Sequence, residues 1–162
     1  MGTEPDNILP IAADDEAAVL ALNNAHAVEL SWLEMDRLRR LLGNAFHARR
    51  VGRLEAFLIA FDETSDYDGG HFLWFRTRYP RFVYVDRVVV DPAARGRGHA
   101  RRLYLDLFDR ARHGGHDIVA CEVNAEPPNP ASDAFHAAMD FATVGSARRH
   151  DKTVRYFVHR LG

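Results

Sequence analysis

A strand, a glycine-containing turn, a helix and a second strand follow one another near the middle of the chain. Residues 81–90 (RFVYVDRVVV) are rich in β-branched and aromatic side chains and predict a strand, which Asp91–Pro92 ends because proline cannot join the hydrogen-bond ladder. Residues 98–112 predict a helix that ends at Gly114–Gly115, and residues 117–123 (DIVACEV) predict another buried strand. Two strands separated by one helix favour a right-handed parallel crossover. The chain is therefore expected to be an α/β protein in which helices cover a sheet.

Shorter predicted elements flank this unit on both sides. Apolar periodicity predicts strands over residues 6–12, 46–51, 54–61, 141–148 and 153–160, and helices over residues 15–23, 34–45 and 131–139. Residues 62–80 are polar and rich in turn formers, so they are expected to form a long connection of the kind that often carries function. The expected order of elements is β-αα-ββ-β-α-β-α-β-β.

Length and composition limit the classes of protein to which the chain can belong. With 162 residues it is expected to form a single domain over residues 1–162. The lone Cys121 excludes an intrachain disulfide scaffold. The sequence shows neither a run of about 20 apolar residues nor a charged-then-apolar leader, so neither a membrane span nor secretion is expected. The expected location is the cytoplasm.

The formal net charge of −2 averages two unlike regions of the chain. The first 36 residues hold eight acidic residues and neither lysine nor arginine, whereas residues 95–112 hold six arginines against Asp106 and Asp109. The arginine cluster suits an anionic small molecule or nucleic acid. Nucleic acid is disfavoured because the overall charge is negative and aromatic residues do not alternate with these arginines. We therefore expect no nucleic-acid partner and no membrane partner.

The turn after the strand 81–90 contains two glycines, Gly96 and Gly98, within the sequence DPAARGRGHA. Glycines let the backbone turn tightly, so that several N–H groups face one point, and the following helix N-terminus adds a partial positive charge. Together these features suit a pyrophosphate. The turn is not a P-loop, which needs Lys-Ser/Thr after the glycines. It is not a dinucleotide fingerprint either, because Arg101 stands in place of the last glycine.

Two motifs resemble those of the GNAT superfamily of N-acetyltransferases. The stretch Arg95–Ala100 (RGRGHA) fits that family's acyl-CoA pyrophosphate loop, in which Gln or Arg is followed by two residues, Gly, one residue, and Gly or Ala. The preceding Val88–Pro92 (VVVDP) is similar to the end of the family's central strand. The stretch Asn129–Phe141 (NPASDAFHAAMDF) is similar to the family's second block, and Glu122–Val123 to the strand end before it. The expected element order agrees with the family over nearly the whole chain.

The resemblance implies an α/β (α+β) fold with a mixed, mostly antiparallel central sheet, helices on both faces and a central parallel strand pair. It implies acetyl-CoA as cosubstrate and direct acetyl transfer to a primary amine in a ternary complex, without a covalent enzyme intermediate. Strand residues 88–90 would pair with the pantetheine arm, and a backbone N–H near Val90 would polarise the acetyl carbonyl. The cofactor-binding residues that the resemblance implies are Val88, Val89, Val90, Arg95, Gly96, Arg97, Gly98, His99, Ala100, Asn129, Ser132 and Phe135.

Three acidic residues are candidates for the general base that takes a proton from the amine. Asp86 lies in mid-strand, and simple alternation puts it on the same face as Tyr84 and Val88, beside the acceptor; the alternative is a salt bridge with a nearby arginine. Glu122 ends the neighbouring strand, where the alternative is a solvated sheet end. Glu29 lies in the expected substrate loop, so Glu29 and Tyr84 are the expected substrate-binding residues. Water is the remaining proton acceptor.

His136 occupies the position of the family's tyrosine, which often protonates the departing thiolate. An imidazole has a pKa near neutrality and could take over this role; the alternative is a packed histidine that bonds a carbonyl. Asp140 is a second departure, because it replaces the family's glycine before Phe141. These departures leave a non-catalytic module that senses acyl-CoA as a second functional hypothesis.

The acceptor is expected to be a small-molecule or peptide amine, and the acidic N-terminal region favours a cationic one. Four aromatic residues between positions 72 and 79 either cover the core, line an acceptor pocket or contact a second copy in a homodimer. The nine histidines show no metal-binding spacing, so no metal site is expected. His113 and His116 flank the Gly114–Gly115 turn and are expected to be solvated.

Overall fold

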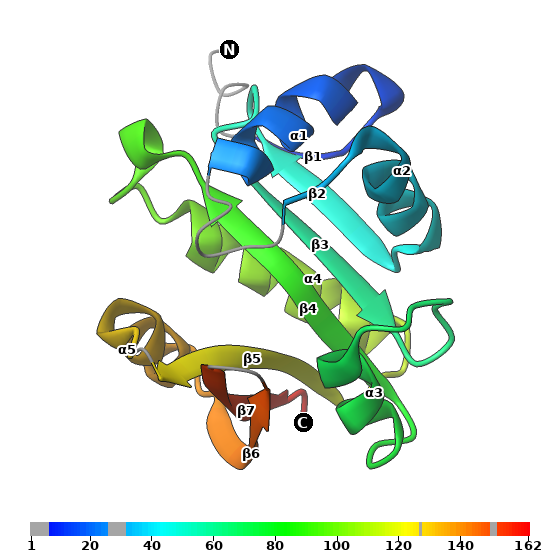
Figure 1. Cartoon of the computed structure of the whole chain (residues 1–162), viewed down its shortest axis with the longest axis vertical. Helices are drawn as coiled ribbons and strands as arrows, with labels where there is room; N and C mark the ends of the chain where they lie inside the picture. The colour runs from blue at the N-terminus through cyan, green and yellow to red at the C-terminus, as the bar shows by residue number, and fades with distance from the viewer. Residues whose placement is uncertain (1–6, 26–31, 127, 150–151) are drawn as a thin grey trace.

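The computed structural model describes residues 7–25, 32–126, 128–149 and 152–162, and Figure 1 shows how its elements are arranged. Within these residues one sheet has the strand order β1-β2-β3-β4-β5-β7-β6. The strands are β1 (Ile8–Pro10), β2 (His47–Val51), β3 (Ala56–Asp62), β4 (Phe82–Val90), β5 (Ile118–Glu126), β6 (Ala142–Arg149) and β7 (Lys152–Arg160). Neighbouring strands are antiparallel except β4 and β5, which are parallel. The predicted mixed, mostly antiparallel sheet with a central parallel pair is confirmed.

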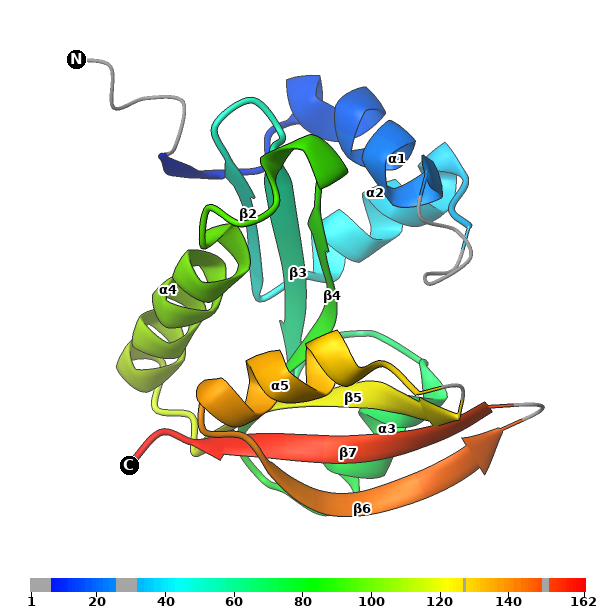
Figure 2. The same ribbon diagram turned by 90° about the vertical axis from the view of Figure 1, so that its left-hand side faces the viewer.

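Helices cover both faces of the sheet, as Figure 2 shows. One face carries α1 (Glu16–Ala25), α2 (Met35–Asn44) and α3 (Gly70–Arg76), and the other carries α4 (His99–His113) and α5 (Pro130–Ala138). Two 3-10 turns, η2 (Ala13–Asp15) and η3 (Pro92–Ala94), precede α1 and α4. Each face has its own apolar core; Leu103 and Leu107 of α4 belong to one, and Leu38 of α2 and Phe75 of α3 to the other. None of the helices in the described ranges is long and apolar enough to cross a membrane.

The two parallel strands separate after a short paired stretch. Residues 82–84 of β4 pair with residues 118–120 of β5, and beyond them β4 follows β3 while β5 follows β7. Both ribbon views show β4 and β5 diverging (Figures 1 and 2). One edge of β4 from residue 85 to residue 90 therefore faces no other described strand. Such an edge presents unpaired backbone groups to which an extended ligand can add as a further strand.

A β-bulge in β4 decides which of its side chains face which layer. The register of β3 against β4 skips Asp86, which is the extra residue of the bulge. As a consequence, Tyr84 packs in the core beneath α1–α3, whereas Val88 packs against the core beneath α4 and α5. The prediction that Asp86, Tyr84 and Val88 share one face is therefore wrong, because one extra residue reverses the alternation.

The structure corrects two other expectations. Helix α3 lies inside the stretch that was expected to be a plain connection, and its Phe72 and Phe75 are fully buried, so that these aromatics cover the core. His113 is exposed as expected, but the side chain of His116 is only 2% exposed. The strand hairpin around Gly52 and the terminal β6–β7 hairpin are confirmed.

Candidate active site

A groove of about 690 Å³ lies where the end of β4, the loop after it, the start of α4 and helix α5 meet. Most of the predicted cofactor-binding residues line it: Val88, Val90, Arg95, Gly96, Gly98, His99, Ala100, Asn129, Ser132 and Phe135. His136 lines it as well. The fold thus brings the glycine loop and the second motif, which lie far apart in the sequence, to the two sides of one groove.

The glycine loop is built to present backbone N–H groups to an anion. Gly96 and Gly98 have φ angles of 83° and 77°, which favour glycine, and a Cβ at either position would meet nothing within 4 Å. Gly98 is the N-cap of α4 and makes no side-chain cap hydrogen bond to the first turn. The first-turn N–H groups of α4 lack acceptors within the helix and carry the positive end of its dipole. With the exposed Arg95 and Arg101 beside them, these groups fit a pyrophosphate.

His99 and Glu55 lie behind this loop. The His99 side chain is 1% exposed, and its Nε2 lies 3.3 Å from Oε2 of Glu55; Nη1 of Arg97 lies 3.7 Å from the same oxygen. The backbone adds a further link, because Asp91 N donates to the Glu55 carbonyl at 2.8 Å. Glu55 in the β2–β3 turn therefore ties that turn to the glycine loop. The sequence offered no signal for Glu55, which is remote from the loop along the chain.

Two of the predicted cofactor-binding residues do not line the groove, and one predicted substrate-binding residue is not placed. The side chain of Val89 packs in the opposite core, since it alternates with Val88 and Val90 along β4. Arg97 turns toward Glu55. Glu29 lies outside the described residues, so the structure does not place it.

Glu122 lies on β5 two residues past the end of the parallel pairing, on the face covered by α1–α3. The Tyr84 hydroxyl donates a hydrogen bond of 2.6 Å to its Oε2. Burial raises the pKa of Glu122 to about 7, although the hydrogen bond from Tyr84 opposes the rise. A carboxyl with such a pKa can accept and release a proton near neutral pH.

Asp86 is engaged by two partners. Tyr67 Oη donates to Oδ1 at 2.6 Å, and Arg87 Nε donates to Oδ2 at 2.7 Å. The side chains of Asp86 and Arg87 are 5% and 8% exposed, and Arg87 Nη1 also donates to Oδ1 of the buried Asn23 at 2.8 Å. The salt bridge that the sequence left open for Asp86 is therefore formed. This network joins β4 to α1 and to the segment before α3.

Sequence reasoning missed three members of this network. Tyr67 lies in the stretch 62–80 that was expected to carry function, so its position was the one available signal. Arg87 follows Asp86 directly, but simple alternation put the two side chains on opposite faces. Asn23 contacts Arg87 because α1 packs against the sheet near β4. No local sequence pattern predicts this contact.

His136 is a packed histidine in this structure. Its Nδ1 lies 2.7 Å from the Ser132 carbonyl, which can only accept, so Nδ1 donates and Nε2 accepts from the Tyr104 hydroxyl at 3.1 Å. Burial lowers the pKa of His136, and its side chain is enclosed by Phe135, Phe141 and other aromatic rings. These contacts favour the neutral imidazole of His136, with a hydrogen bond at each ring nitrogen.

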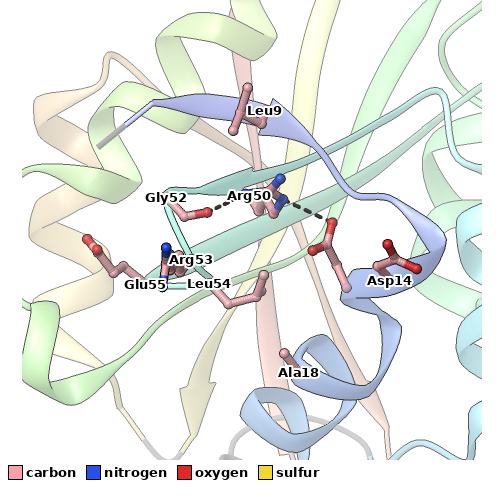
Figure 3. Close-up of a pocket in the computed structure, with 9 residues that line it drawn as sticks. Leu9, Asp14, Ala18, Arg50, Gly52, Arg53, Leu54 and Glu55 are labelled. Carbon is pink, nitrogen blue, oxygen red and sulfur yellow. Dashed lines mark hydrogen bonds and ion pairs between the residues drawn. The ribbon is translucent and has the colours of Figure 1, made fainter. Parts of the chain in front are cut away.

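A second cavity of about 640 Å³ lies between η2, α1 and the β2–β3 turn (Figure 3). Arg50 crosses it, with Nε donating to Oδ2 of Asp15 at 2.9 Å and Nη1 donating to the Gly52 carbonyl. Glu55 lines this cavity as well. Because these polar groups bond to one another, the groove beside α4 is the stronger candidate for a ligand site.

Comparison with known proteins agrees with this geometry. The model of the Acetyltransferase (GNAT) family matches residues 67–141. L-2,4-diaminobutyric acid acetyltransferase of Nocardia farcinica is 32% identical over 76% of this chain and 53% of the relative. The N-alpha-acetyltransferase RimI of Mycobacterium tuberculosis is 42% identical over 45% of this chain and 44% of the relative. The chain thus spans about half the length of the curated relatives it matches.

Solved structures share the fold over nearly the full chain. The protein yncA of Salmonella typhimurium, solved with its cofactor acetyl-CoA, superposes with a TM-score of 0.70 at 20% identity, covering 98% of this chain and 95% of that one. The ribosomal-protein-alanine N-acetyltransferase of Brucella melitensis superposes with a TM-score of 0.73 at 20% identity, covering 95% of this chain and 99% of that one. The matched family model over residues 67–141, the curated relatives and the shared fold agree that this chain is similar to the GNAT acetyltransferases.

Proposed function

We propose that the chain transfers an acetyl group from acetyl-CoA to a primary amine by direct attack in a ternary complex. The observation that carries this proposal is the position of Glu122. Its carboxyl, with a pKa of about 7, lies on one face of the sheet just past the point where β4 and β5 separate, and the anion-binding groove lies on the other face. A proton acceptor on one face of the sheet and a groove on the other, next to the point where the two strands separate, suit a reaction between two bound substrates.

The groove would hold the cosubstrate. The N–H groups at Gly96, Gly98 and the first turn of α4 would bind the pyrophosphate, and the neighbouring arginines would balance its charge. Val88 and Val90 would bring the free edge of β4 against the pantetheine arm, with a backbone N–H near Val90 donating to the acetyl carbonyl. Asn129 Oδ1 accepts from Ser132 N at 3.2 Å and so shapes the opposite wall at the start of α5.

On the other face, Glu122 would take the proton that the attacking ammonium must lose, directly or through a water. Tyr84 holds Glu122 in place, and its own pKa is raised by burial, so it remains a hydrogen-bond donor. Asp86 accepts hydrogen bonds from Tyr67 and Arg87, and the guanidinium of Arg87 balances its charge. Asp86 would therefore act as a positioning residue on the face that carries Glu122. Between the two candidates for the base that the structure places, Asp86 and Glu122, the geometry favours Glu122.

The described residues support direct attack over a covalent route. Cys121 is the one cysteine of the chain, it is buried, and burial raises the pKa of its thiol well above the ordinary value. A thiol in that state is a poor nucleophile. The sulfur in the reaction would then be that of the cosubstrate, and water is the proton source available to the thiolate, since both ring nitrogens of His136 are engaged.

The relatives suggest two classes of acceptor for this chain. The Nocardia relative is named for a small diamino acid and the Mycobacterium relative for N-terminal amines. The partly buried carboxyl of Glu122 favours an acceptor that arrives as an ammonium ion. We therefore propose a small cationic amine as the first acceptor to test, with a peptide N-terminus as the second.

Two measurements test the proposal in sequence. Acetyl-CoA at saturating concentration is expected to raise the melting temperature of the protein, because a ligand that binds only the folded state stabilises it. Release of free thiol from acetyl-CoA is then followed with 2,4-diaminobutyrate, simple diamines and a peptide with N-terminal alanine. Amine-dependent thiol release supports the transferase. Thermal protection without thiol release from any amine would instead support the sensing module, and absence of protection would refute both.

A further inference from the structure

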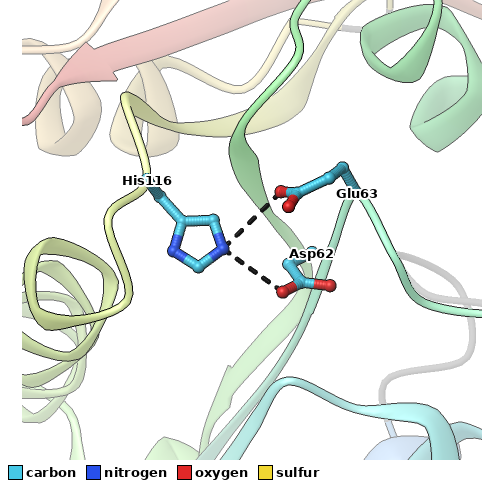
Figure 4. Close-up of side chains that lie close together, drawn as sticks. All are labelled: Asp62, Glu63 and His116. Atoms are coloured by element: carbon cyan, nitrogen blue, oxygen red, sulfur yellow. Dashed lines mark hydrogen bonds and ion pairs between the residues drawn. The ribbon is translucent and has the colours of Figure 1, made fainter.

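Three side chains with metal-ligating atoms meet at the end of the sheet opposite the groove. Asp62 ends β3, Glu63 follows it, and His116 lies in the turn between α4 and β5. Their ligand atoms all lie within 4.8 Å of one another, and Figure 4 shows the three side chains pointing to a common centre. We propose that Asp62, Glu63 and His116 form a binding site for a divalent transition-metal cation, with Zn²⁺ as the best-fitting ion.

The two separations that involve His116 are close to those of a tetrahedral zinc site. Nε2 of His116 lies 3.2 Å from Oδ2 of Asp62 and 3.6 Å from Oε1 of Glu63. Ligands at about 2.0–2.1 Å from zinc in tetrahedral geometry are about 3.3 Å apart. A charge-assisted hydrogen bond between an imidazolium and a carboxylate is shorter, at about 2.7–2.9 Å. Here the imidazole nitrogen faces two carboxylates, at the long end of hydrogen-bond distance from Asp62 and beyond that distance from Glu63, a spacing that a shared ion also gives.

The tautomer of His116 leaves its inward nitrogen ready for a cation. Nδ1 lies 3.1 Å from the carbonyl oxygen of Ala111, which can only accept, so Nδ1 carries a hydrogen. Nε2 is then the ring atom that faces the two carboxylates. A cation placed between them would contact all three side chains, and the separations suit a metal ion.

Each ligand is also oriented through its other polar atoms, as is usual around bound metals. Thr64 donates to Oδ1 of Asp62 from its backbone N at 2.9 Å and from Oγ1 at 2.6 Å. Arg81 holds the second carboxylate, with Nε 3.2 Å from Oε2 of Glu63.

Burial separates this cluster from an ordinary patch of surface acids. The side chains of Asp62, Glu63 and His116 are 14%, 16% and 2% exposed. The cluster is also remote from the groove, because Asp62 pairs with Val83 while the groove begins at Val88 and Val90 on the same strand. At about 3.3 Å per residue the two sites are roughly 15–25 Å apart along β4. The ion would therefore fasten the end of β3 to the α4–β5 turn and would not take part in acyl transfer.

The test is titration of the tag-free, chelator-treated protein with Zn²⁺ in a calorimeter, with Co²⁺ absorption as a second readout of tetrahedral coordination. We expect one Zn²⁺ per chain and a higher melting temperature with zinc. Glu63→Gln, at the cluster's edge, and His116→Gln should each weaken binding by at least about 100-fold, since even loss of an outer-shell partner weakens a metal site about 10- to 100-fold. His113→Gln, on the exposed side of the same turn, is the matched control and should bind like the wild type.

Either of two results would overturn the proposal. Lack of zinc binding in the wild type at millimolar Zn²⁺ would leave a proton, and not a metal, between the carboxylates. Zinc binding of unchanged affinity in folded Glu63→Gln would place the ion elsewhere. Because Glu63 lies outside the acyl-transfer machinery, neither result bears on the proposed function.

Discussion

Replacing Glu122 by glutamine separates the chemical role of this carboxyl from its effect on stability. Burial raises the pKa of Glu122 from 4.5 to about 7, so the folded state resists its ionisation. At about 1.36 kcal/mol per pKa unit, the ionised carboxyl lowers the free energy of unfolding by about 3 kcal/mol above pH 7. The penalty begins near pH 4.5 and is complete above the folded-state pKa, because in that window the folded state binds more protons than the unfolded state.

Glutamine is neutral at every pH and its amide oxygen can still accept from Tyr84. At pH 8 the Glu122→Gln protein should therefore melt about 6–12 °C above the wild type, since about 1 kcal/mol corresponds to about 2–4 °C in a domain of this size. Most of this difference should vanish at pH 5, where the wild-type carboxyl is protonated. At pH 8 the kcat/KM of the Glu122→Gln protein should be about 10²- to 10⁴-fold below that of the wild type, which is the usual contribution of a general base.

The assays are thermal denaturation and amine-dependent thiol release, both measured from pH 5 to pH 9. The wild-type kcat/KM should rise with an apparent pKa near 7 that is absent in Glu122→Gln, while any inflection shared by both proteins belongs to the amine. Glu126→Gln, exposed at the end of the same strand, is the control and should alter neither quantity. A Glu122→Gln protein with wild-type kcat/KM, or one whose stability gain does not depend on pH, would refute the reasoning.

Three further substitutions test other parts of the site. Tyr84→Phe removes a hydrogen bond that lowers the pKa of Glu122, so the rising limb of the pH–rate profile should move to higher pH; an unchanged or lower midpoint would contradict this. Gly98→Ala places a side chain at a φ of 77°, which costs about 1–2 kcal/mol. This substitution should raise the KM for acetyl-CoA far more than it changes kcat. Unchanged affinity for acetyl-CoA would show that the loop is not part of the binding site. His136→Phe removes the hydrogen bond from the Tyr104 hydroxyl to Nε2 and should lower the free energy of unfolding by about 0.5–1.5 kcal/mol while turnover is preserved. Lost turnover at unchanged stability would make His136 catalytic.

The sequence predicted the strands, their hairpins and the glycine loop because these depend on local patterns. Apolar alternation, Gly52, and Gly96 with Gly98 each leave a clear local signal, and the structure places the corresponding elements within a few residues. The position of Asp86 could not be predicted in this way. The bulge that displaces it arises from the register of β3 against β4, and a one-residue insertion leaves the alternation on either side intact.

Contacts between remote segments account for the other differences. Glu55 reaches His99 only because the β2–β3 turn packs beside the glycine loop, and the pKa of Glu122 depends on burial that no neighbouring residue reveals. His116 was expected to be solvated because it follows two glycines. The turn instead folds it inward against Asp62 of β3. Such placements follow from tertiary packing, which overrides local preference.

The central claim is that two substrates meet in one complex and that an amine attacks the thioester directly. Initial rates of thiol release, measured while acetyl-CoA and the best amine of the panel are varied together, test it most directly. Direct transfer predicts double-reciprocal lines that intersect and a rate that falls to background without amine. Parallel lines would indicate a covalent acetyl-enzyme, and thiol release that does not depend on amine would contradict the account.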